Sequence, residues 1–492
     1  MPTPPPTPSG HRFPAALALG VAALLLALPV PLWAQERLPR GGGGNELAAS
    51  LFFTDVPQHA LDVVAGRPTD HAVTLSLLAY APRRVVVHYG TSAQTLAAHT
   101  ADLDLSAGKP KAIELADLAP NAPFFFEVRT ADAENTLLQR GQFHTQRSAG
   151  AGFTFTVTAD SHLDFNTRTD VYERTLNNIV ADRPDLHFDL GDTFMTEKYN
   201  VFAESQAQYL AQRYWFGLVS TVAPVFLTLG NHDGEAGFVP QQQKRGMALW
   251  SAQMRTAYFP NPEPNAFYSG NNQPMQGVGT LQDYYAFEWG DAQFIVLDPF
   301  WPTEARGGRD ASGWDMTLGA AQYEWLVKQL QTSRAQFRFV FIHHLIGGGG
   351  TERRGGIESA PFFEWGGRDA NGRDQFAQRR PGWAMPIHAL MVKYGVNVVF
   401  HGHDHLFAHQ ELDGVVYQEV PQPSHAENRV QAMATEYGYL HGDILPSPGH
   451  MRVTIDSGVA TVDYVRSYLP AEVRQGRVNG RMDLSYQLRP RT

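Results

Sequence analysis

Short, continuously apolar runs recur through the chain, and they constrain its fold more than any other feature. An apolar run of this length without alternation is typical of a strand that is buried on both faces, as in a parallel sheet covered by helices. We therefore expect an α/β domain. Its predicted strands are Phe153–Thr158, Leu186–Leu190, Val225–Leu229, Phe294–Leu297, Phe337–Ile342 and Val396–Phe400.

Helical periodicity fills several of the segments between these runs. The predicted helices are Val171–Ala181, Ala203–Val219, Ala320–Gln331 and Pro386–Tyr394. Later apolar runs indicate antiparallel additions at Val415–Val420, Met451–Ile455 and Val459–Val465. This order of elements favours a pair of mixed sheets flanked by helices.

A polar motif comes at the end of five of the predicted strands. The motifs are Asp160-Ser161-His162, Gly191-Asp192, Gly230-Asn231-His232-Asp233, His343-His344 and Gly402-His403-Asp404-His405. In open α/β sheets the carboxyl ends of the strands meet at one edge, where ligands bind. We therefore expect the five motifs to form a single site.

The side chains of these motifs are suited to metal ions. The chain has no cysteine, so a metal would be held by nitrogen and oxygen atoms. First-row ions accept imidazole and carboxylate, and two ions that share a carboxylate lie about 3.5–4 Å apart. We assign one ion to Asp160, His162, Asp192 and His405, and the other to Asp192, Asn231, His343 and His403.

Such a pair of ions predicts a hydrolytic reaction at phosphorus. A hydroxide that bridges the ions would form near pH 7, because the metals pull the pKa of bound water down to about 7. His232 follows the ligand Asn231, and we expect it to stabilise charge in the transition state and to protonate the leaving oxygen. Asp192 or Asp233 would orient its ring, so the predicted catalytic residues are His232, Asp192 and Asp233.

In this order the five motifs resemble those of the calcineurin-like metallophosphoesterases, over about residues 150–470. The resemblance implies a four-layer α/β/β/α sandwich, two divalent or trivalent metal ions (iron, manganese or zinc) and phosphoester hydrolysis. It also favours His343 over His344 as the ligand, although Leu345 replaces the proline that follows in the family. The match to purple acid phosphatases is weaker, because Met195 stands where their tyrosinate ligand does and they lack the imidazole of His162.

Four further residues are candidates for binding the substrate. The segment 347–383 is rich in glycine and arginine, and a loop of this length inside a compact domain is usually functional. Arg353 and Arg354 in this segment could hold a phosphate group through paired hydrogen bonds. His344 and Trp301, which lies just beyond a strand end, complete this set.

The first part of the chain has a different pattern. Residues 1–34 are typical of a signal peptide, because their apolar stretch of about 16 residues falls short of the roughly 20 that span a membrane. Residues 35–50 contain a glycine-rich linker. We therefore expect an exported protein, periplasmic or extracellular, with no stable membrane span after cleavage.

Short β-type runs separated by turn signals occupy residues 51–148 and predict a small all-β sandwich. The passage Leu115–Phe124 resembles fibronectin type III modules. We place the catalytic domain at residues 150–470 and a C-terminal tail at residues 471–492.

The preferred function is that of an exported dinuclear-metal phosphoesterase that hydrolyses small-molecule phosphomonoesters by attack of the bridging hydroxide on phosphorus. One alternative is a phosphodiesterase acting on small glycerophosphoryl or nucleotide diesters. Another is a non-catalytic, metal-containing cell-surface binding protein. No nucleic-acid partner is expected, because the formal charge is −10 and no basic tract is present. The oligomeric state stays open.

Overall fold

The computed structural model describes residues 47–165, 167–239, 246–303, 313–347, 354–426 and 429–491. The predicted signal peptide, most of the predicted linker and Arg353 lie outside the described residues. Within these ranges, no helix is both long enough and apolar enough to cross a membrane.

Two antiparallel sheets come first in the described chain. One sheet has the order β1-β2-β6 and the other β4-β3-β7-β8, with β5 paired to β3. The strands are β1 (Leu61–Gly66), β2 (Val73–Ala79), β3 (Arg83–Gly90), β4 (Ala98–His99), β5 (Leu103–Leu105), β6 (Lys111–Leu115), β7 (Pro123–Thr130) and β8 (Leu137–His144). Leucine, valine and phenylalanine side chains from both sheets form one buried core between them.

These antiparallel sheets are packed firmly against the α/β part of the chain. Val64 of β1 and Leu78 of β2 belong to the same buried cluster as residues of helices α1 (Thr169–Asp182) and α2 (Gln206–Val219). Arg213 of α2 is fully buried and donates two hydrogen bonds to Ser76, to Oγ at 3.0 Å and to the carbonyl oxygen at 2.7 Å. A buried guanidinium needs such partners, because an unpaired buried charge is costly.

The first mixed sheet has six strands in the order β11-β10-β9-β20-β21-β22. They are β9 (Phe153–Thr158), β10 (Leu186–Asp189), β11 (Val225–Leu227), β20 (Gly449–Asp456), β21 (Val459–Arg466) and β22 (Met482–Leu488). The first three in the chain are parallel; β20 then pairs antiparallel with β9, β21 with β20, and β22 with β21. β22 therefore makes residues 482–488 part of this sheet, although the sequence analysis placed them in a tail.

The second mixed sheet has eight strands in the order β12-β13-β14-β15-β16-β18-β17-β19. They are β12 (Ser269–Gly270), β13 (Tyr285–Trp289), β14 (Ala292–Val296), β15 (Phe337–Phe341), β16 (Val398–His401), β17 (Phe407–Leu412), β18 (Val415–Glu419) and β19 (Asp443–Leu445). The central strands β14, β15, β16 and β18 are parallel. Their carboxyl ends therefore lie at one edge.

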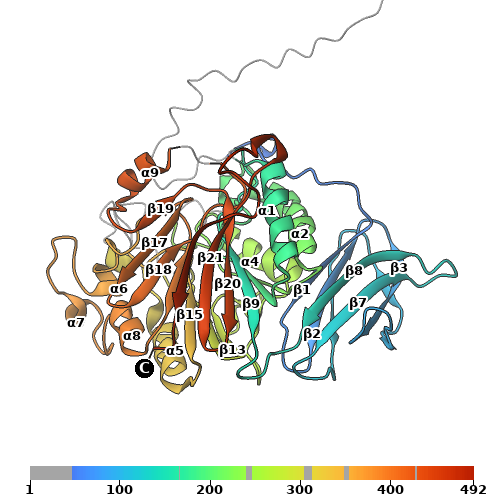
Figure 1. Cartoon of the computed structure of the whole chain (residues 1–492), viewed down its shortest axis with the longest axis horizontal. Helices are drawn as coiled ribbons and strands as arrows, with labels where there is room; N and C mark the ends of the chain where they lie inside the picture. Colours follow the sequence, from blue (N-terminus) through green and yellow to red (C-terminus); the bar gives the residue numbers. More distant parts are fainter. Residues whose placement is uncertain are drawn as a thin grey trace, which may run out of the picture. The chain divides into compact units, whose positions relative to one another are not determined.

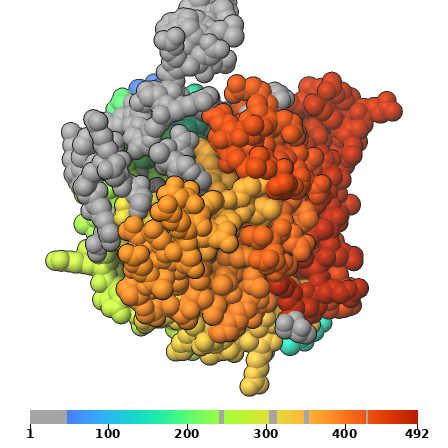
Figure 2. Space-filling view, turned by 90° about the vertical axis from the view of Figure 1, so that its left-hand side faces the viewer, coloured from blue at the N-terminus to red at the C-terminus, as the bar shows by residue number. Residues whose placement is uncertain are grey.

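Helices cover the outer faces of the two sheets (Figure 1). Helices α1 and α2 pack on the six-stranded sheet, and α5 (Gly319–Thr332) and α8 (Ile387–Lys393) pack on the eight-stranded sheet. The remaining α-helices are α4 (Met247–Tyr258), α6 (Phe363–Gly366), α7 (Phe376–Arg379) and α9 (Val430–Tyr437). The 3-10 helices are η2 (Ala49–Leu51), η3 (Thr196–Lys198), η4 (Phe202–Ser205), η6 (Gly313–Asp315) and η7 (Pro470–Glu472). Figure 2 shows the side of the eight-stranded sheet, whose surface comes mainly from the later part of the chain.

The two mixed sheets meet through phenylalanine side chains, which form the core between them. Phe188 of β10 stacks on Phe341 of β15 with ring centroids 4.3 Å apart, and Phe341 stacks on Phe400 of β16 at 5.3 Å. Each such pair contributes about 0.5–1.5 kcal/mol beyond burial. Because each ring precedes a polar motif by only a few residues, this packing brings strand ends from both sheets together.

The predicted fold class is confirmed: two mixed sheets between helices, preceded by antiparallel β-sheets. The main differences lie in elements that the sequence analysis did not predict, including α4, β13 and β22. The apolar side chains of β22 are only partly buried against the core, so its sequence lacks the continuous apolar run of a central strand.

Candidate metal centre

The five motifs begin where parallel strands end, and their backbone is unusual. Asp160, His162, Asp192, His403 and His405 all have positive φ angles, between 44° and 83°. The left-handed region costs a residue with a side chain of the order of 1 kcal/mol, and such residues concentrate at functional sites. The loops therefore hold these five side chains in conformations that the chain would not adopt by local preference.

Two glycines allow the loops after β10 and β11 to approach each other. A Cβ atom on Gly230 would lie 2.0 Å from the backbone nitrogen of Asp192, and one on Gly191 would lie 2.3 Å from the backbone nitrogen of Gly230. Gly191 also has a φ of +95°. Any larger residue at either position would push apart the loops that carry Asp192 and Asn231.

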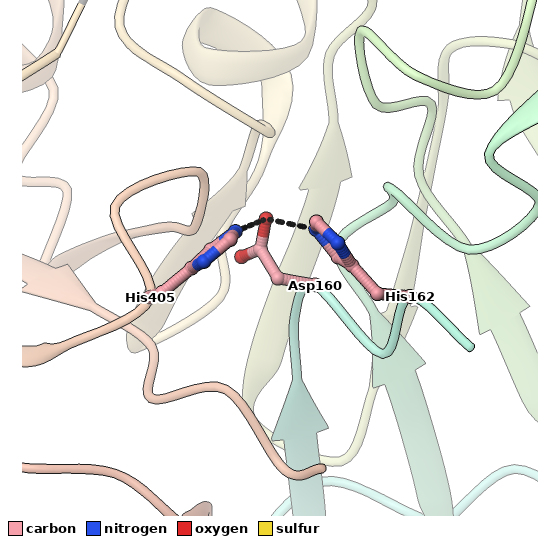
Figure 3. Close-up of side chains that lie close together, drawn as sticks. All are labelled: Asp160, His162 and His405. Atoms are coloured by element: carbon pink, nitrogen blue, oxygen red, sulfur yellow. Dashed lines mark ion pairs between the residues drawn. The ribbon is translucent and has the colours of Figure 1, made fainter. Parts of the chain in front are cut away.

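The first cluster consists of Asp160, His162 and His405, whose potential ligand atoms all lie within 4.8 Å of one another. Figure 3 shows the two imidazoles on either side of the Asp160 carboxylate. Asp160 Oδ1 lies 3.5 Å from His405 Nε2 and 3.9 Å from His162 Nε2, longer than an ordinary hydrogen bond. Asp160 Oδ1 and His162 Nε2 are buried and have no hydrogen-bond partner among the described residues.

The second cluster consists of Asp192, His343 and His403, all buried and within the same 4.8 Å limit. His343 Nε2 lies 3.3 Å from Asp192 Oδ2 and 3.0 Å from Asn231 Oδ1. The other ring nitrogen of His343, Nδ1, donates to the carbonyl oxygen of Leu190 at 2.9 Å. That bond fixes the ring so that Nε2 faces the cluster.

Asp192 lies between the two clusters. Its Oδ2 is 3.3 Å from His343 Nε2 in the second cluster and 3.8 Å from His162 Nε2 in the first. The other oxygen, Oδ1, accepts a hydrogen bond from the backbone nitrogen of His232 at 2.8 Å. Asp192 is therefore placed to share its carboxylate between two neighbouring cations.

The charges of the site also suit cations. Burial raises the pKa of Asp160, but the neighbouring His162 and His405 imidazoles outweigh burial and lower it, so this carboxylate is ionised. Burial lowers the pKa of His403 far below its usual value, which keeps a lone pair available on the neutral ring. Burial also disfavours charge on His343, but the negative charge of Asp192 outweighs it and raises the pKa to about 10. A metal cation would balance the same negative charge of Asp192.

The two clusters fit a dinuclear metal site. The donor atoms are imidazole nitrogens and carboxylate oxygens, which first-row ions accept, and two of them, Asp160 Oδ1 and His162 Nε2, have no hydrogen-bond partner in the described parts of the chain. Among the described residues, no other group of three or more His, Asp or Glu side chains meets the same distance limit. The ligand set predicted from the sequence is thus brought together, with Asn231 Oδ1 beside the second cluster.

His232 has a partner that the sequence analysis missed. Its Nδ1 lies 2.5 Å from Glu197 Oε1, whereas its Nε2 lies 3.8 Å from Asp192 Oδ2. Its side chain is 24% exposed, so it is among the accessible groups of the site, together with His405 at 30%. Glu197 is thus placed to orient the imidazole, a role that the sequence analysis gave to Asp192 or Asp233.

Asp233 is bonded to the backbone of the neighbouring loops. Its two carboxylate oxygens accept hydrogen bonds from the backbone nitrogens of Gly230, Asp192, Thr193 and Phe194, at 2.7–3.2 Å. Burial and the charge of Asp192 raise the pKa of Asp233 to about 7, while the N–H groups of Phe194, Gly230 and Thr193 favour its ionised form. Asp233 is therefore placed to fix the loop that carries Asp192.

His162 is supported by a buried ion pair. Its Nδ1 lies 3.5 Å from Asp164 Oδ2, and the same oxygen accepts a hydrogen bond from Lys198 Nζ at 2.9 Å. Burial raises the pKa of Asp164, but Lys198 and His162 outweigh burial and lower it well below the usual range. The carboxylate of Asp164 thus orients His162 from the side opposite the cluster.

Arg354 contacts the loop between the two candidate ligands His403 and His405. Its Nη1 donates to the carbonyl oxygen of His403 at 2.8 Å and to Asp404 Oδ1 at 2.9 Å, and its guanidinium lies 4.2 Å from the ring centroid of Tyr437. Asp404 Oδ2 accepts a hydrogen bond from the hydroxyl of Tyr439 at 2.8 Å. These contacts use its side chain to hold the His403 loop, and substrate binding by Arg354 stays a prediction.

Two other substrate candidates, Trp301 and His344, have side-chain contacts of their own. Trp301 donates from Nε1 to Glu235 Oε2 at 2.8 Å, and Glu235 is held in turn by the buried Arg255. The ring of His344 lies edge-on to Phe300, with centroids 5.4 Å apart, and 5.2 Å from the ring of His403. His344 is thus beside the site, whereas His343 supplies the nitrogen that faces Asp192.

The family follows from this architecture and from a sequence comparison. The family model of the calcineurin-like phosphoesterases matches residues 153–407, a range that includes all five motifs. The chain belongs to this family of metal-dependent phosphoesterases. No curated protein sequence gives a significant match.

Solved structures show the same fold over most of the chain. PhoD aligns with a TM-score of 0.62 and 15% identity, over 89% of this chain and 91% of that chain. Purple acid phosphatase PPD1, isolated from yellow lupin (Lupinus luteus) seeds, aligns with a TM-score of 0.55 and 14% identity, over 88% of this chain and 74% of that chain. Both alignments extend beyond the catalytic part, in agreement with a β-sandwich region in front of it.

Proposed function

We propose that the chain is an exported phosphoesterase that hydrolyses phosphomonoesters at a dinuclear metal centre. The observation that carries the proposal is the pair of buried His/Asp clusters with Asp192 between them. Two metal ions at such a site supply a nucleophile at neutral pH and stabilise the charge of an in-line displacement. Iron, manganese and zinc suit the nitrogen and oxygen donors.

The protein side chains have separate tasks in this proposal. Asp160, His162, His405, His343 and His403 are arranged to hold the ions. His232 is 24% exposed and keeps Nε2 directed away from Glu197, so this nitrogen can pass a proton to the leaving oxygen. The strained backbone of the ligand loops keeps this arrangement in place before the substrate arrives.

Metal reconstitution followed by assays on a monoester and a diester tests the proposed substrate class. The purified protein would be treated with a chelator, reloaded with manganese, zinc, iron or cobalt, and assayed on p-nitrophenyl phosphate and bis-p-nitrophenyl phosphate. We expect metal-dependent hydrolysis with a higher kcat/KM for the monoester. A higher kcat/KM for bis-p-nitrophenyl phosphate would assign the chain to phosphodiesterases, and no turnover of either ester with any of the four metals would refute the proposed function.

Export is the second part of the proposal. It rests on the sequence of residues 1–34, whose polar start, apolar stretch and small residues before Ala34 are typical of a cleaved signal peptide. N-terminal sequencing of the protein recovered from the periplasm or the medium of an expressing bacterium would test it. We expect a mature chain that begins close to residue 35, and a full-length protein retained in the cytoplasm would contradict export.

A further inference from the structure

Residues 47–53, which we call the N-terminal strap, lie against the loop that follows β10. Leu47 forms a parallel bridge with Tyr199, and its backbone nitrogen donates to the carbonyl oxygen of Lys198. The carbonyl oxygen of Leu47 accepts a hydrogen bond from the nitrogen of Asn200 at 2.8 Å. The strap therefore pairs with the end of the loop that begins at Asp192.

The strap also contacts the loop that follows β9. The backbone nitrogen of Phe53 donates to the carbonyl oxygen of Leu163 at 2.7 Å. Leu163 is the residue directly after His162 and has a φ of +79°. One short segment thus contacts the loop that carries Asp160 and His162 as well as the loop that begins at Asp192.

Phe52 makes the main side-chain contact of the strap. Its ring stacks on the ring of Tyr199, with centroids 3.7 Å apart and planes 9° from parallel. Phe52, Tyr199 and Met195 form a buried apolar cluster of their own, in which Phe52 is 6% exposed. The neighbouring side chain of Phe53 points outward and is 44% exposed.

The 3-10 helix η3 lies between Met195 and Tyr199, the two loop residues of this cluster. A single 3-10 turn has poor hydrogen-bond geometry and depends on tertiary contacts for its stability. η3 nevertheless supplies two groups that reach the centre. Glu197 is bonded to His232 Nδ1, and Lys198 is bonded to Asp164, which faces His162.

We infer that the N-terminal strap is a positioning element of the metal centre: the stack of Phe52 on Tyr199 fixes η3, and η3 fixes the rings of His232 and His162. The inference rests on the proposed function, since it assigns these two rings to catalysis and metal binding. Phe52 is a positioning residue, because it acts through its contacts with Tyr199 and Met195.

The test compares three variants of the full chain. Phe52→Ala should lower kcat for p-nitrophenyl phosphate at saturating metal by about tenfold or more, since small misplacements of reacting groups have effects of this size. KM should stay within about twofold, because the contacts with the substrate remain. Phe53→Ala should keep the parent kcat, and Phe52→Tyr, which can still stack, should restore most of it.

Amide hydrogen exchange gives a second readout that does not need activity. Exchange at residues 193–200 should rise in Phe52→Ala and stay at the parent level in Phe53→Ala. If the alanine variant does not fold, Phe52→Leu replaces it, and Phe124→Leu in the β-sandwich controls for the loss of a buried aromatic ring elsewhere. Faster exchange at residues 193–200 in Phe52→Leu, but not in Phe124→Leu, would support the inference that the strap fixes η3.

The outcomes separate this inference from the proposed function. A parent protein that hydrolyses neither ester refutes the proposed function, and exchange at residues 193–200 then still decides whether Phe52 fixes η3. Parent-like kcat and parent-like exchange in the Phe52 variants would overturn the inference, even if the parent protein is an active phosphoesterase.

Discussion

Glu197 Oε1 lies 2.5 Å from Nδ1 of His232, although the two residues are 35 positions apart in the chain. The carboxylate accepts the proton of Nδ1 and so determines which ring nitrogen faces the centre. The nitrogen that remains, Nε2, lies 3.8 Å from Asp192 Oδ2. Glu197 therefore orients His232, the residue proposed to protonate the leaving oxygen, beside the shared carboxylate of Asp192.

Glu197→Gln should lower kcat by about 10- to 100-fold, because a correctly oriented acid contributes about 10²–10⁴-fold to such reactions and the variant keeps part of the orientation. The amide can accept the same hydrogen bond but does not stabilise a protonated ring. Metal content should equal that of the parent, since Glu197 belongs to neither cluster. Steady-state kinetics beside metal analysis by mass spectrometry would check both expectations.

Glu204→Gln is the matched control, because Glu204 lies in the next 3-10 helix and is exposed. It should have parent kinetics. Loss of metal from the Glu197 variant, in proportion to its loss of rate, would show instead that the carboxylate supports the metals and not the ring of His232.

Asp192→Asn should lower metal content and activity together. An amide offers one weaker donor oxygen in place of a charged carboxylate that faces His343 and His162. We expect a fall in bound metal from two ions per chain to about one or fewer, and a loss of kcat/KM of at least about 100-fold. Asp170→Asn, at an exposed position in α1, is the control. Full metal content with an unchanged rate in the Asp192 variant would refute the shared carboxylate.

Most of the centre could be predicted from the sequence because the relevant signals are local. A continuous apolar run predicts a buried strand, and a polar motif directly after it must lie at the strand end, so the residue order alone is enough to place Asp160, Asp192 and His343. The rings of Phe188 and Phe341 supply the physical reason that these ends meet.

The supporting residues could not be predicted in this way, because their partners are distant in sequence. Glu197 lies in a single 3-10 turn with no periodic pattern, and its role depends on the fold of the loop above β10. Arg354 resembles an anion-binding residue in the sequence because arginines cluster in its segment, but charge alone does not reveal that Asp404 lies 2.9 Å away. The roles of Glu197 and Arg354 both depend on tertiary contacts that the sequence does not show.

Arg354→Ala should weaken metal binding more than substrate binding. The guanidinium holds the carbonyl oxygen of His403 and the carboxylate of Asp404, so its loss should loosen the loop between His403 and His405. We expect about 10-fold weaker metal affinity, the size of effect found for groups that orient ligands, with KM near the parent value at saturating metal. Metal titrations of the chelated protein, followed by activity, would measure both.

Arg373→Ala is a suitable control for this variant, since Arg373 lies in the same segment and is exposed. It should bind metal and substrate as the parent does. If Arg354→Ala raises KM severalfold while its metal affinity is unchanged, Arg354 contacts the phosphate group after all.

Asp182, at the end of α1, links that helix to β20 and should make stability depend on pH. Its carboxylate accepts hydrogen bonds from His450 Nε2 at 2.8 Å and Arg452 Nη1 at 2.7 Å. Burial raises the pKa of Asp182, but His450 and Arg452 outweigh burial and lower it below the usual value. A folded-state pKa below the unfolded value of about 3.9 stabilises the protein above that pH, and this contribution is lost as the pH falls through the folded-state value.

Asp182→Asn should therefore lower the free energy of unfolding by about 1 kcal/mol at pH 7, because the amide keeps a hydrogen-bond acceptor but removes the charge. The difference should be constant between pH 7 and about pH 5 and should shrink as the pH falls below about 4, because the carboxyl of the unfolded parent chain takes up its proton there and that of the folded chain only at lower pH. Urea unfolding of both proteins across this range would measure it. Asp456→Asn, at an exposed strand end, should show no such difference, and a deficit of the Asp182 variant that stays constant down to about pH 3 would contradict the lowered pKa.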